Sequence, residues 1–406
     1  MQANLKSRAF GSPVQIPTVL TAGFRFFFLA AGLYAVFAMF AWVGWLVAQA
    51  NGGVLFSFSQ DMMPYHWHAH ELIFGYTSAV MAGFFLTAVP NWTGTRDAKA
   101  FFVSLSGLLW LSGRIAVWFS GVIDPLLVAI VDLAFVPLLA LNILPRLARK
   151  SQVRNMVFLF LLTALFTANL LVHLEWMGWS SGTAESGVRL GIFVSAGMIA
   201  IVGGRVVPAF TRNALSRQGL TENLPQSFPP LEKAGILAAM LAALASLPFV
   251  PAVVLGILCL AAGVLNFLRL IGWKGWLTIN APILWVLHLS FLLLAVGYLV
   301  YGSSLVFGGI GEIAALHLLA VGAVGCMTLA MMTRASLGHS GRPLKLSTPI
   351  VIAFVALVLA ALSRTFGTLV FGYFPVMFAA GTLWIAAFSL FAIIYFPILT
   401  RKRISG

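Results

Sequence analysis

The sequence predicts an all-α polytopic membrane protein with about twelve transmembrane helices. Hydrophobic residues make up 61% of its 406 residues and charged residues only 8%, whereas a soluble domain carries about 25% charged residues. The chain is therefore too apolar to cover itself with a hydrated surface. Its 34 Phe and 12 Trp suit helices that face lipid and place aromatic rings at the membrane interface.

Twelve apolar segments are long enough to cross a bilayer, which requires about 20 helical residues. Each is bounded by polar residues, Pro or Gly, and the tight turn "SLPFVPAV" separates the seventh from the eighth. We expect one integral membrane domain, residues 1–406. Its helices are predicted at residues 27–48, 68–90, 99–120, 123–143, 155–177, 187–209, 233–249, 251–271, 281–302, 311–333, 347–370 and 373–399.

The positions of Lys and Arg predict the orientation. With twelve spans, every Lys and Arg except Arg114, Arg189 and Arg364 falls on the side that holds both termini. Cytoplasmic loops carry the excess of Lys and Arg, so both termini are predicted to be cytoplasmic. The net charge of +14 is therefore a topology signal, and no nucleic-acid partner is needed to explain it.

The three exceptional arginines lie in the third, sixth and eleventh spans, toward the outer leaflet. Ionised groups within a membrane are costly and usually pair or serve a site. One interpretation is structural ion pairing with acids at a similar depth. The other is that Arg114, Arg189 and Arg364 bind the anionic edge of a cofactor, because guanidinium binds carboxylates in a bidentate manner. The acids at this depth are Glu71, Asp132, Glu175 and Glu312.

Three of the seven histidines lie within "PYHWHAHE", at the outer end of the second span. If this segment is helical, His66 and His70 share a face and His68 points away. If it is extended, all three lie on one side. Either geometry presents two imidazoles to one metal, and neutral imidazole suits copper, iron and zinc.

His317 lies six residues into the tenth span, which also descends from the outer side. It is therefore predicted at nearly the depth of His70, one or two helical turns below the interface at ~1.5 Å per residue. Two helices that each supply one histidine are a common way to hold a b-type haem in a bundle. We therefore expect His70 and His317 to be its axial ligands.

Internal similarity supports an equivalence of the second and tenth spans. The segments that begin at His70 and His317 align without gaps and match at two glycines each. The sixth span ends in "PAFT", which resembles the "PNWT" at the end of the second. We expect three repeats of four spans, with a site at their interface. The matched glycines are Gly75 and Gly94 in the second span, and Gly322 and Gly341 in the tenth.

The other histidines have less specific surroundings. His288, in the inner half of the ninth span, is either a core hydrogen-bonding residue or a second metal site. His173, beside Glu175 near the outer end of the fifth span, is expected at the membrane interface. His339 lies in the turn-rich inner segment "TRASLGHSGRP", where no metal is expected.

Three segments resemble hallmark sequences of the NnrS family: "HWHAHELIFGYTSAVMAGFFLTAVPNWTG", "GGRVVPAFTRN" and "HLLAVGAVGCMTLAMMTRASLGHSGRPL". The resemblance extends from about Arg25 to the final helix. It implies a bacterial inner-membrane protein of twelve spans that carries haem and copper and is linked to nitric oxide and nitrosative stress. The residues that match the family's segments are His66, His68, His70, Glu71, Arg205, His317, Arg334 and His339.

The resulting hypothesis is a haem- and copper-containing membrane protein that relieves nitric oxide stress. His70 and His317 would hold the haem iron, with Arg114 and Arg364 near the propionates, and His66 and His68 are the copper candidates. Binding, sensing and redox conversion of nitric oxide are all compatible with such ligands, and no redox partner is indicated. A histidine on the second and tenth spans also resembles the haem–copper oxidase core. The chain lacks that core's further histidines, so oxidase activity is not expected.

Two other classes of protein fit the same pattern. A secondary transporter would use Asp132 and the outer arginines as a substrate or proton site, with histidines as proton relays. A metal-delivery or assembly factor would pass copper from its histidine cluster to a partner.

Overall fold

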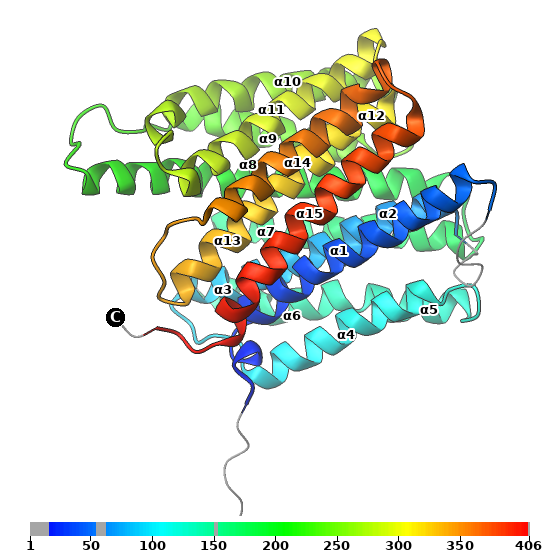
Figure 1. Ribbon diagram of the computed structural model, residues 1–406, viewed down its shortest axis with the longest axis horizontal. Helices are drawn as coiled ribbons and strands as arrows, with labels where there is room; N and C mark the ends of the chain where they lie inside the picture. Colours follow the sequence, from blue (N-terminus) through cyan, green and yellow to red (C-terminus); the bar gives the residue numbers. More distant parts are fainter. Residues whose placement is uncertain (1–15, 54–61, 150–152, 405–406) are drawn as a thin grey trace, which may run out of the picture.

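A computed structural model describes residues 16–53, 62–149 and 153–404, and the regular elements in these ranges are all helices (Figure 1). The helices run in parallel and antiparallel directions along one long bundle. Their bounds are α1 Gly23–Ala50, α2 Pro64–His70, η2 Glu71–Thr77, α3 Ser78–Thr93, α4 Ala100–Trp118, α5 Pro125–Leu133, α6 Phe135–Arg149, α7 Val153–Trp176, α8 Thr183–Arg217, α9 Pro229–Ala245, α10 Ala252–Gly272, α11 Pro282–Phe307, α12 Glu312–His317, η4 Leu318–Gly325, α13 Cys326–His339, α14 Thr348–Phe366 and α15 Tyr373–Thr400, with short 3₁₀ turns η1 Thr18–Leu20, η3 Gly275–Thr278 and η5 Gly367–Leu369.

These helices lie at the twelve positions predicted from hydropathy. Continuous runs α2–η2–α3 and α12–η4–α13 form the second and tenth spans, and α5 with α6 forms the fourth. In the described residues, eleven segments are long and apolar enough to cross a membrane, and α9, with 17 residues, falls just short of them. The class of all-α polytopic membrane protein is confirmed.

The two ends of the helical bundle indicate an even number of crossings and so favour counting α9 as one. Arg25, at the start of α1, donates hydrogen bonds to the carbonyl oxygens of Leu399 (3.0 Å) and Arg401 (2.7 Å) at the end of α15. The first and last spans therefore begin and end on the same side, which requires an even number of crossings. The eleven long spans and α9 together give the predicted twelve.

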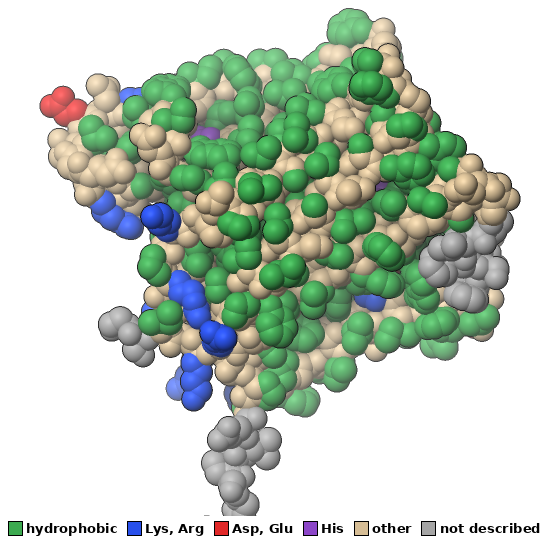
Figure 2. Space-filling model, in the orientation of Figure 1, with side chains coloured by type: hydrophobic (Ala, Val, Ile, Leu, Met, Phe, Trp, Pro, Cys, Tyr) green, Lys and Arg blue, Asp and Glu red, His purple; other side chains and the backbone are tan. Residues whose placement is uncertain are grey.

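Basic side chains gather at the end of the bundle that carries the C-terminus, and hydrophobic side chains cover most of the rest of this face (Figure 2). This arrangement follows the positive-inside pattern on which the orientation was predicted. The predicted inner residues Lys6, Arg8 and Lys150 lie outside the described residues.

The helix contacts repeat the same pattern three times. The first and second spans of each predicted repeat pack together: α1 on η2 and α3, α7 on α8, and α11 on η4 and α13. The last span of each repeat packs on the first span of the next, as α6 on α7, α10 on α11, and α15 on α1. The chain is therefore arranged as three four-helix units around a common centre, as the internal similarity predicted.

Two π-helical segments lie at equivalent positions in the first and third units. The segment η2 begins directly after His70, and η4 begins directly after His317. The two segments that align without gaps from His70 and His317 therefore share a backbone conformation as well as sequence similarity. Single turns of π-helix occur often at functional sites, so both histidines lie where the helix geometry is unusual.

Candidate functional site

The histidine segment is helical, and this separates its side chains. Pro64 is the first residue of α2, where its missing N–H costs no hydrogen bond. With 3.6 residues per turn, side chains two positions apart point to nearly opposite sides. His68 therefore faces a different part of the bundle from His66 and His70.

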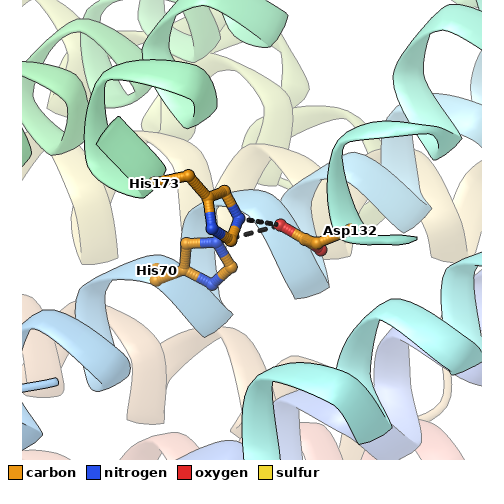
Figure 3. Close-up of side chains that lie close together, drawn as sticks. All are labelled: His70, Asp132 and His173. Atoms are coloured by element: carbon orange, nitrogen blue, oxygen red, sulfur yellow. Dashed lines mark hydrogen bonds and ion pairs between the residues drawn. The ribbon is translucent and has the colours of Figure 1, made fainter. Parts of the chain in front are cut away.

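His70 lies in a fully buried polar cluster, with 0% of its surface exposed. Its Nδ1 is 2.8 Å from Glu71 Oε1, and its Nε2 is 3.1 Å from Asp132 Oδ2 and 2.9 Å from Asn169 Oδ1. The second histidine of the cluster, His173, has its Nε2 2.9 Å from the same Asp132 Oδ2 (Figure 3). Both ring nitrogens of His70 are thus engaged by side chains of its own surroundings.

Arg114 joins the two acids of this cluster. Its Nη1 donates to Glu71 Oε1 at 2.6 Å, and its Nη2 donates to Asp132 Oδ1. Tyr34 donates its hydroxyl proton to the other oxygen of Glu71. Two carboxylates and one guanidinium leave a net charge of −1 when both histidines are neutral. One further positive charge, either a proton on Glu71 or on a histidine, or a metal ion, would make this buried cluster neutral.

A glycine in η2 makes room for this network. A Cβ atom on Gly75 would lie 2.8 Å from both Arg114 Nη1 and the Tyr34 ring. The carbonyl oxygen of Gly75 also accepts a 2.9 Å hydrogen bond from Trp110 Nε1. Because Gly75 has no side chain, the guanidinium of Arg114 has the space that it needs to reach Glu71.

The geometry of the cluster suits a metal ion. Ligand atoms of His70, Asp132 and His173 all lie within 4.8 Å of one another. Two imidazoles and a carboxylate are a donor set that copper, zinc and iron accept. The ionic network itself holds the donors in place, with Asn169 Nδ2 donating to Asp132 Oδ2 at 2.8 Å. The same residues also form a complete buried ion-pair network without a metal.

Sequence reasoning did not bring these residues together, because they come from three different spans. His173 was expected at the interface but is buried. Asp132 was expected either to pair with an outer arginine, as it does with Arg114, or to belong to a transporter site. One signal was available: Asn169 and His173 are four residues apart, and therefore share a face of α7. That pair faces α5, which carries the buried carboxylate.

A second group forms around His68. His68, His317 and Arg364 lie close enough to act on one another electrostatically. The ring of His68 stacks on Trp42, with 4.5 Å between centroids and 15° between planes, and Trp42 stacks in turn on Trp45. His68 rather than His70 is therefore the histidine of the second span that approaches His317.

The polar atoms of this second group fit a haem. His317 Nδ1 is 2.6 Å from the carbonyl oxygen of Ile313, which holds its proton on Nδ1 and leaves Nε2 as a metal ligand. His68 Nδ1 is buried and has no hydrogen-bond partner in the described residues. Arg364 lies close enough to Tyr373 for an electrostatic interaction, but it forms no hydrogen bond or ion pair with any described residue. An imidazole pair beside an unpaired guanidinium matches the iron and the propionates of haem b.

The remaining predicted site residues have protein partners elsewhere. Arg189 forms ion pairs with Glu312 (3.2 Å) and Glu185 (3.5 Å) at the end of the bundle away from the termini. His66 is half-buried, and its ring lies 4.5 Å from that of Tyr65. His66 and His68 are two positions apart on α2 and therefore point to different sides of that helix. Their assignment as copper candidates stays a prediction.

The two histidines of the inner side also have ordinary structural contacts. His288 Nε2 is 2.9 Å from Thr211 Oγ1, which agrees with the core hydrogen-bonding interpretation. The ring of His339 lies 5.5 Å from that of Phe24. No cluster of three metal-ligating side chains includes either of them in the described part of the chain.

Together these features define a polytopic helical membrane protein with a buried histidine cluster around His70 and a half-buried histidine group around His68, both near the end of the bundle opposite its termini. The family model of the NnrS protein matches residues 18–403, nearly the whole chain, so the chain belongs to the NnrS family. This confirms the predicted membership and supports a membrane protein related to nitric oxide. No match was found among curated proteins.

Proposed function

We propose that this protein binds a b-type haem between His68 and His317 and a copper ion at His70, Asp132 and His173. In this proposal it binds or converts nitric oxide in a bacterial inner membrane and so protects the cell against nitrosative stress. Membership of the NnrS family supports the link to nitric oxide. The side-chain geometry supports the two cofactor sites.

The observation that carries the proposal is the combination of His68, His317 and Arg364. Two imidazoles and one cation from three spans lie close enough to interact electrostatically, and neither His68 nor Arg364 has a hydrogen-bonding partner in the described residues. A buried polar group without a partner costs about 1–3 kcal/mol. An arrangement that leaves such groups unpaired is explained if a ligand completes it.

The protein's own residues would position the haem and limit its surroundings. The hydrogen bond from His317 Nδ1 to Ile313 fixes the ring orientation. Trp42 supports the ring of His68 from one side. Arg364 would bind a propionate, because it is the predicted outer arginine whose guanidinium has no acidic partner in the described structure. When bound, the haem would supply a redox-active iron, and an iron held by two imidazoles would bind nitric oxide only in exchange for one of them.

The donor atoms of His70, Asp132 and His173, and the charge of that cluster, support copper at the second site. With both carboxyl groups ionised and both histidines neutral, the cluster would lack one positive charge, and a Cu⁺ ion would supply it. Arg114 and Asn169 would then hold the carboxylate of Asp132 in place as a second layer of hydrogen bonds. This proposal prefers the cluster to His66 and His68 as the copper site because those two side chains point to different sides of α2.

An anaerobic titration with nitric oxide tests the function. We expect the purified full-length protein to show a Soret band that shifts when nitric oxide is added. The control is Arg364→Gln, which keeps both imidazoles and should retain a nitric oxide response with lower haem occupancy. A protein expressed with adequate haem that shows no Soret band would contradict the proposal and favour the transporter alternative.

Metal analysis tests the copper site. We expect Asp132→Asn and His173→Gln to lose copper while keeping haem. His66→Gln is the matched control because it removes an imidazole from α2 outside the cluster, and its copper content should stay at the wild-type level. Loss of copper from the His66 variant alone would restore the assignment made from the sequence.

A further inference from the structure

An apolar cavity of about 70 Å³ lies in the centre of the bundle, apart from both histidine groups. A water molecule needs roughly 10–15 Å³ of such space, so this cavity is several times larger. Three spans supply almost all of its lining, namely the second, the sixth and the tenth. The fourteen lining residues include no charged side chain.

The cavity is formed by the same positions in each repeat. Counted from His70 and from His317, the lining residues of the second and tenth spans lie at the same four places: 7, 10, 11 and 14 residues further on. The match of "PNWT" with "PAFT" makes Val188 the equivalent of these histidines in the sixth span, and the same four places line the cavity there. These residues are Thr77, Val80, Met81 and Phe84; Val324, Met327, Thr328 and Met331; and Ser195, Met198, Ile199 and Val202.

The cavity offers no free hydrogen-bond donor. The hydroxyl groups of Thr77, Ser195 and Thr328 donate to carbonyl oxygens of their own helices at 2.9, 2.8 and 2.6 Å. All other lining side chains are apolar, and four of them are methionines. Cavities of this kind stay free of water and take up small apolar molecules such as xenon. A charged or strongly polar substrate would lose its hydration here without replacement.

The cavity lies a short distance further along the second and tenth spans than His70 and His317. Thr77 and Val324 lie seven residues beyond His70 and His317, at the far end of the π-helical segments η2 and η4. The cavity is therefore deeper in the bilayer than the proposed cofactor sites. A molecule that reaches it from lipid would be close to those sites without crossing water.

We propose that this central cavity is a docking site for a small uncharged gas molecule, and specifically for nitric oxide. An uncharged diatomic gas fits its size and its lack of free polar groups. The identity of the gas rests on the proposed function, whereas uptake of a gas by the cavity does not. The four methionines are natural probes of the occupant.

The test uses the full-length protein labelled with ¹³C at its methionine methyl groups. Under xenon pressure, we expect saturable shifts of the signals of Met81, Met198, Met327 and Met331. The exposed Met63 and Met156 serve as references within the same sample. Nitric oxide is paramagnetic, so under anaerobic conditions it should broaden the same four signals selectively.

Three variants show whether the xenon and nitric oxide responses come from the cavity or from unspecific effects of a substitution. Val202→Phe fills the cavity and should abolish both responses. Val264→Phe makes the same change at a side chain that is 49% exposed on α10, and should leave both intact. Met198→Ala enlarges the cavity and should increase xenon uptake, so the proposal stays testable if the filled variant does not fold.

Two outcomes would overturn the inference. The first is that the four lining methionines respond to xenon no more than Met63 and Met156 do. The second is that xenon binds but nitric oxide does not broaden these signals. The haem-depleted variant His317→Ala separates this result from failure of the proposed function, since its cavity should still take up both gases.

Discussion

At the residue scale, the decisive feature is that His68 and His70 belong to different sites although one residue separates them. His70 is held by Glu71, Asp132 and Asn169, whereas His68 stacks on Trp42 near His317. The sequence alone permitted a helix or an extended segment, and it placed His70 at the depth of His317. Depth in the membrane does not distinguish His68 from His70, because the two differ in the direction in which their side chains point.

The buried ionic network makes a strong prediction for Arg114. Arg114→Ala leaves the carboxylates of Glu71 and Asp132 without their cation. Breaking a buried ion pair from one side costs about 3–5 kcal/mol, so we expect a large fall in the thermal stability of the protein in detergent. Thermal unfolding followed by circular dichroism measures it.

Arg189→Ala is the matched control for that experiment. Its pair with Glu312 is partly exposed, with 19% and 38% of the two side chains accessible. Partly exposed pairs contribute about 0–1 kcal/mol, so this variant should lose little stability. Equal losses in the two variants would show that the buried network does not stabilise the fold as described.

Gly75 and Gly322 provide a second comparison, because they are equivalent positions of the first and third repeats. A Cβ on Gly75 would lie 2.8 Å from Arg114 and Tyr34, whereas on Gly322 the nearest atom, at 3.3 Å, is the flexible end of Leu318. We expect Gly75→Ala to cost about 1–3 kcal/mol through overpacking and Gly322→Ala to be tolerated. Thermal stability of both variants checks this. The reverse order would contradict the described packing.

At the element scale, the second, sixth and tenth spans line the centre of the molecule, and the second and tenth are the most alike. Both contain a π-helical segment directly after the aligned histidine, and a 2.6 Å hydrogen bond joins Tyr76 to Thr328 between them. Their equivalence could be predicted from the sequence because the alignment needed no gaps. Their π-helical geometry could not, because it depends on how these spans pack.

The bond between Tyr76 and Thr328 should couple the two repeats energetically. Hydrogen bonds between membrane helices contribute about 0.6 kcal/mol on average and at most about 1.7 kcal/mol. We expect a double-mutant cycle of Tyr76→Phe and Thr328→Val to give a coupling of this size in thermal unfolding. Strictly additive effects of the two substitutions would show that this contact does not link the repeats.

At the scale of the whole molecule, hydropathy was sufficient for the positions of eleven spans, whereas the twelfth, α9, is too short to be established in this way. Each span must satisfy its backbone internally in lipid, so the apolar runs mark the helices directly. The candidate sites required more, because Asp132, His173 and Arg364 lie far apart in the chain. Only packing shows which of their side chains meet. The central cavity could be anticipated in part, since repeats commonly place a site at their interface.

The crossing of the short helix α9 is a further prediction for the whole molecule. The two native cysteines are both buried, so single surface cysteines can report the topology. Phe249→Cys, at a residue 78% exposed between α9 and α10, should react with an impermeant maleimide from the outside of intact cells. Leu220→Cys, 45% exposed before α9, should react only after permeabilisation. Labelling of both from one side would remove α9 from the crossings.

The haem content of three purified single variants tests the central claim most directly. We expect His68→Ala and His317→Ala to lose the haem, measured as Soret absorbance per protein. We expect a properly folded His70→Ala to retain it, because His70 belongs to the cluster with Asp132 and His173. Retention of haem by His68→Ala together with its loss from His70→Ala would contradict this account and restore the His70–His317 pair.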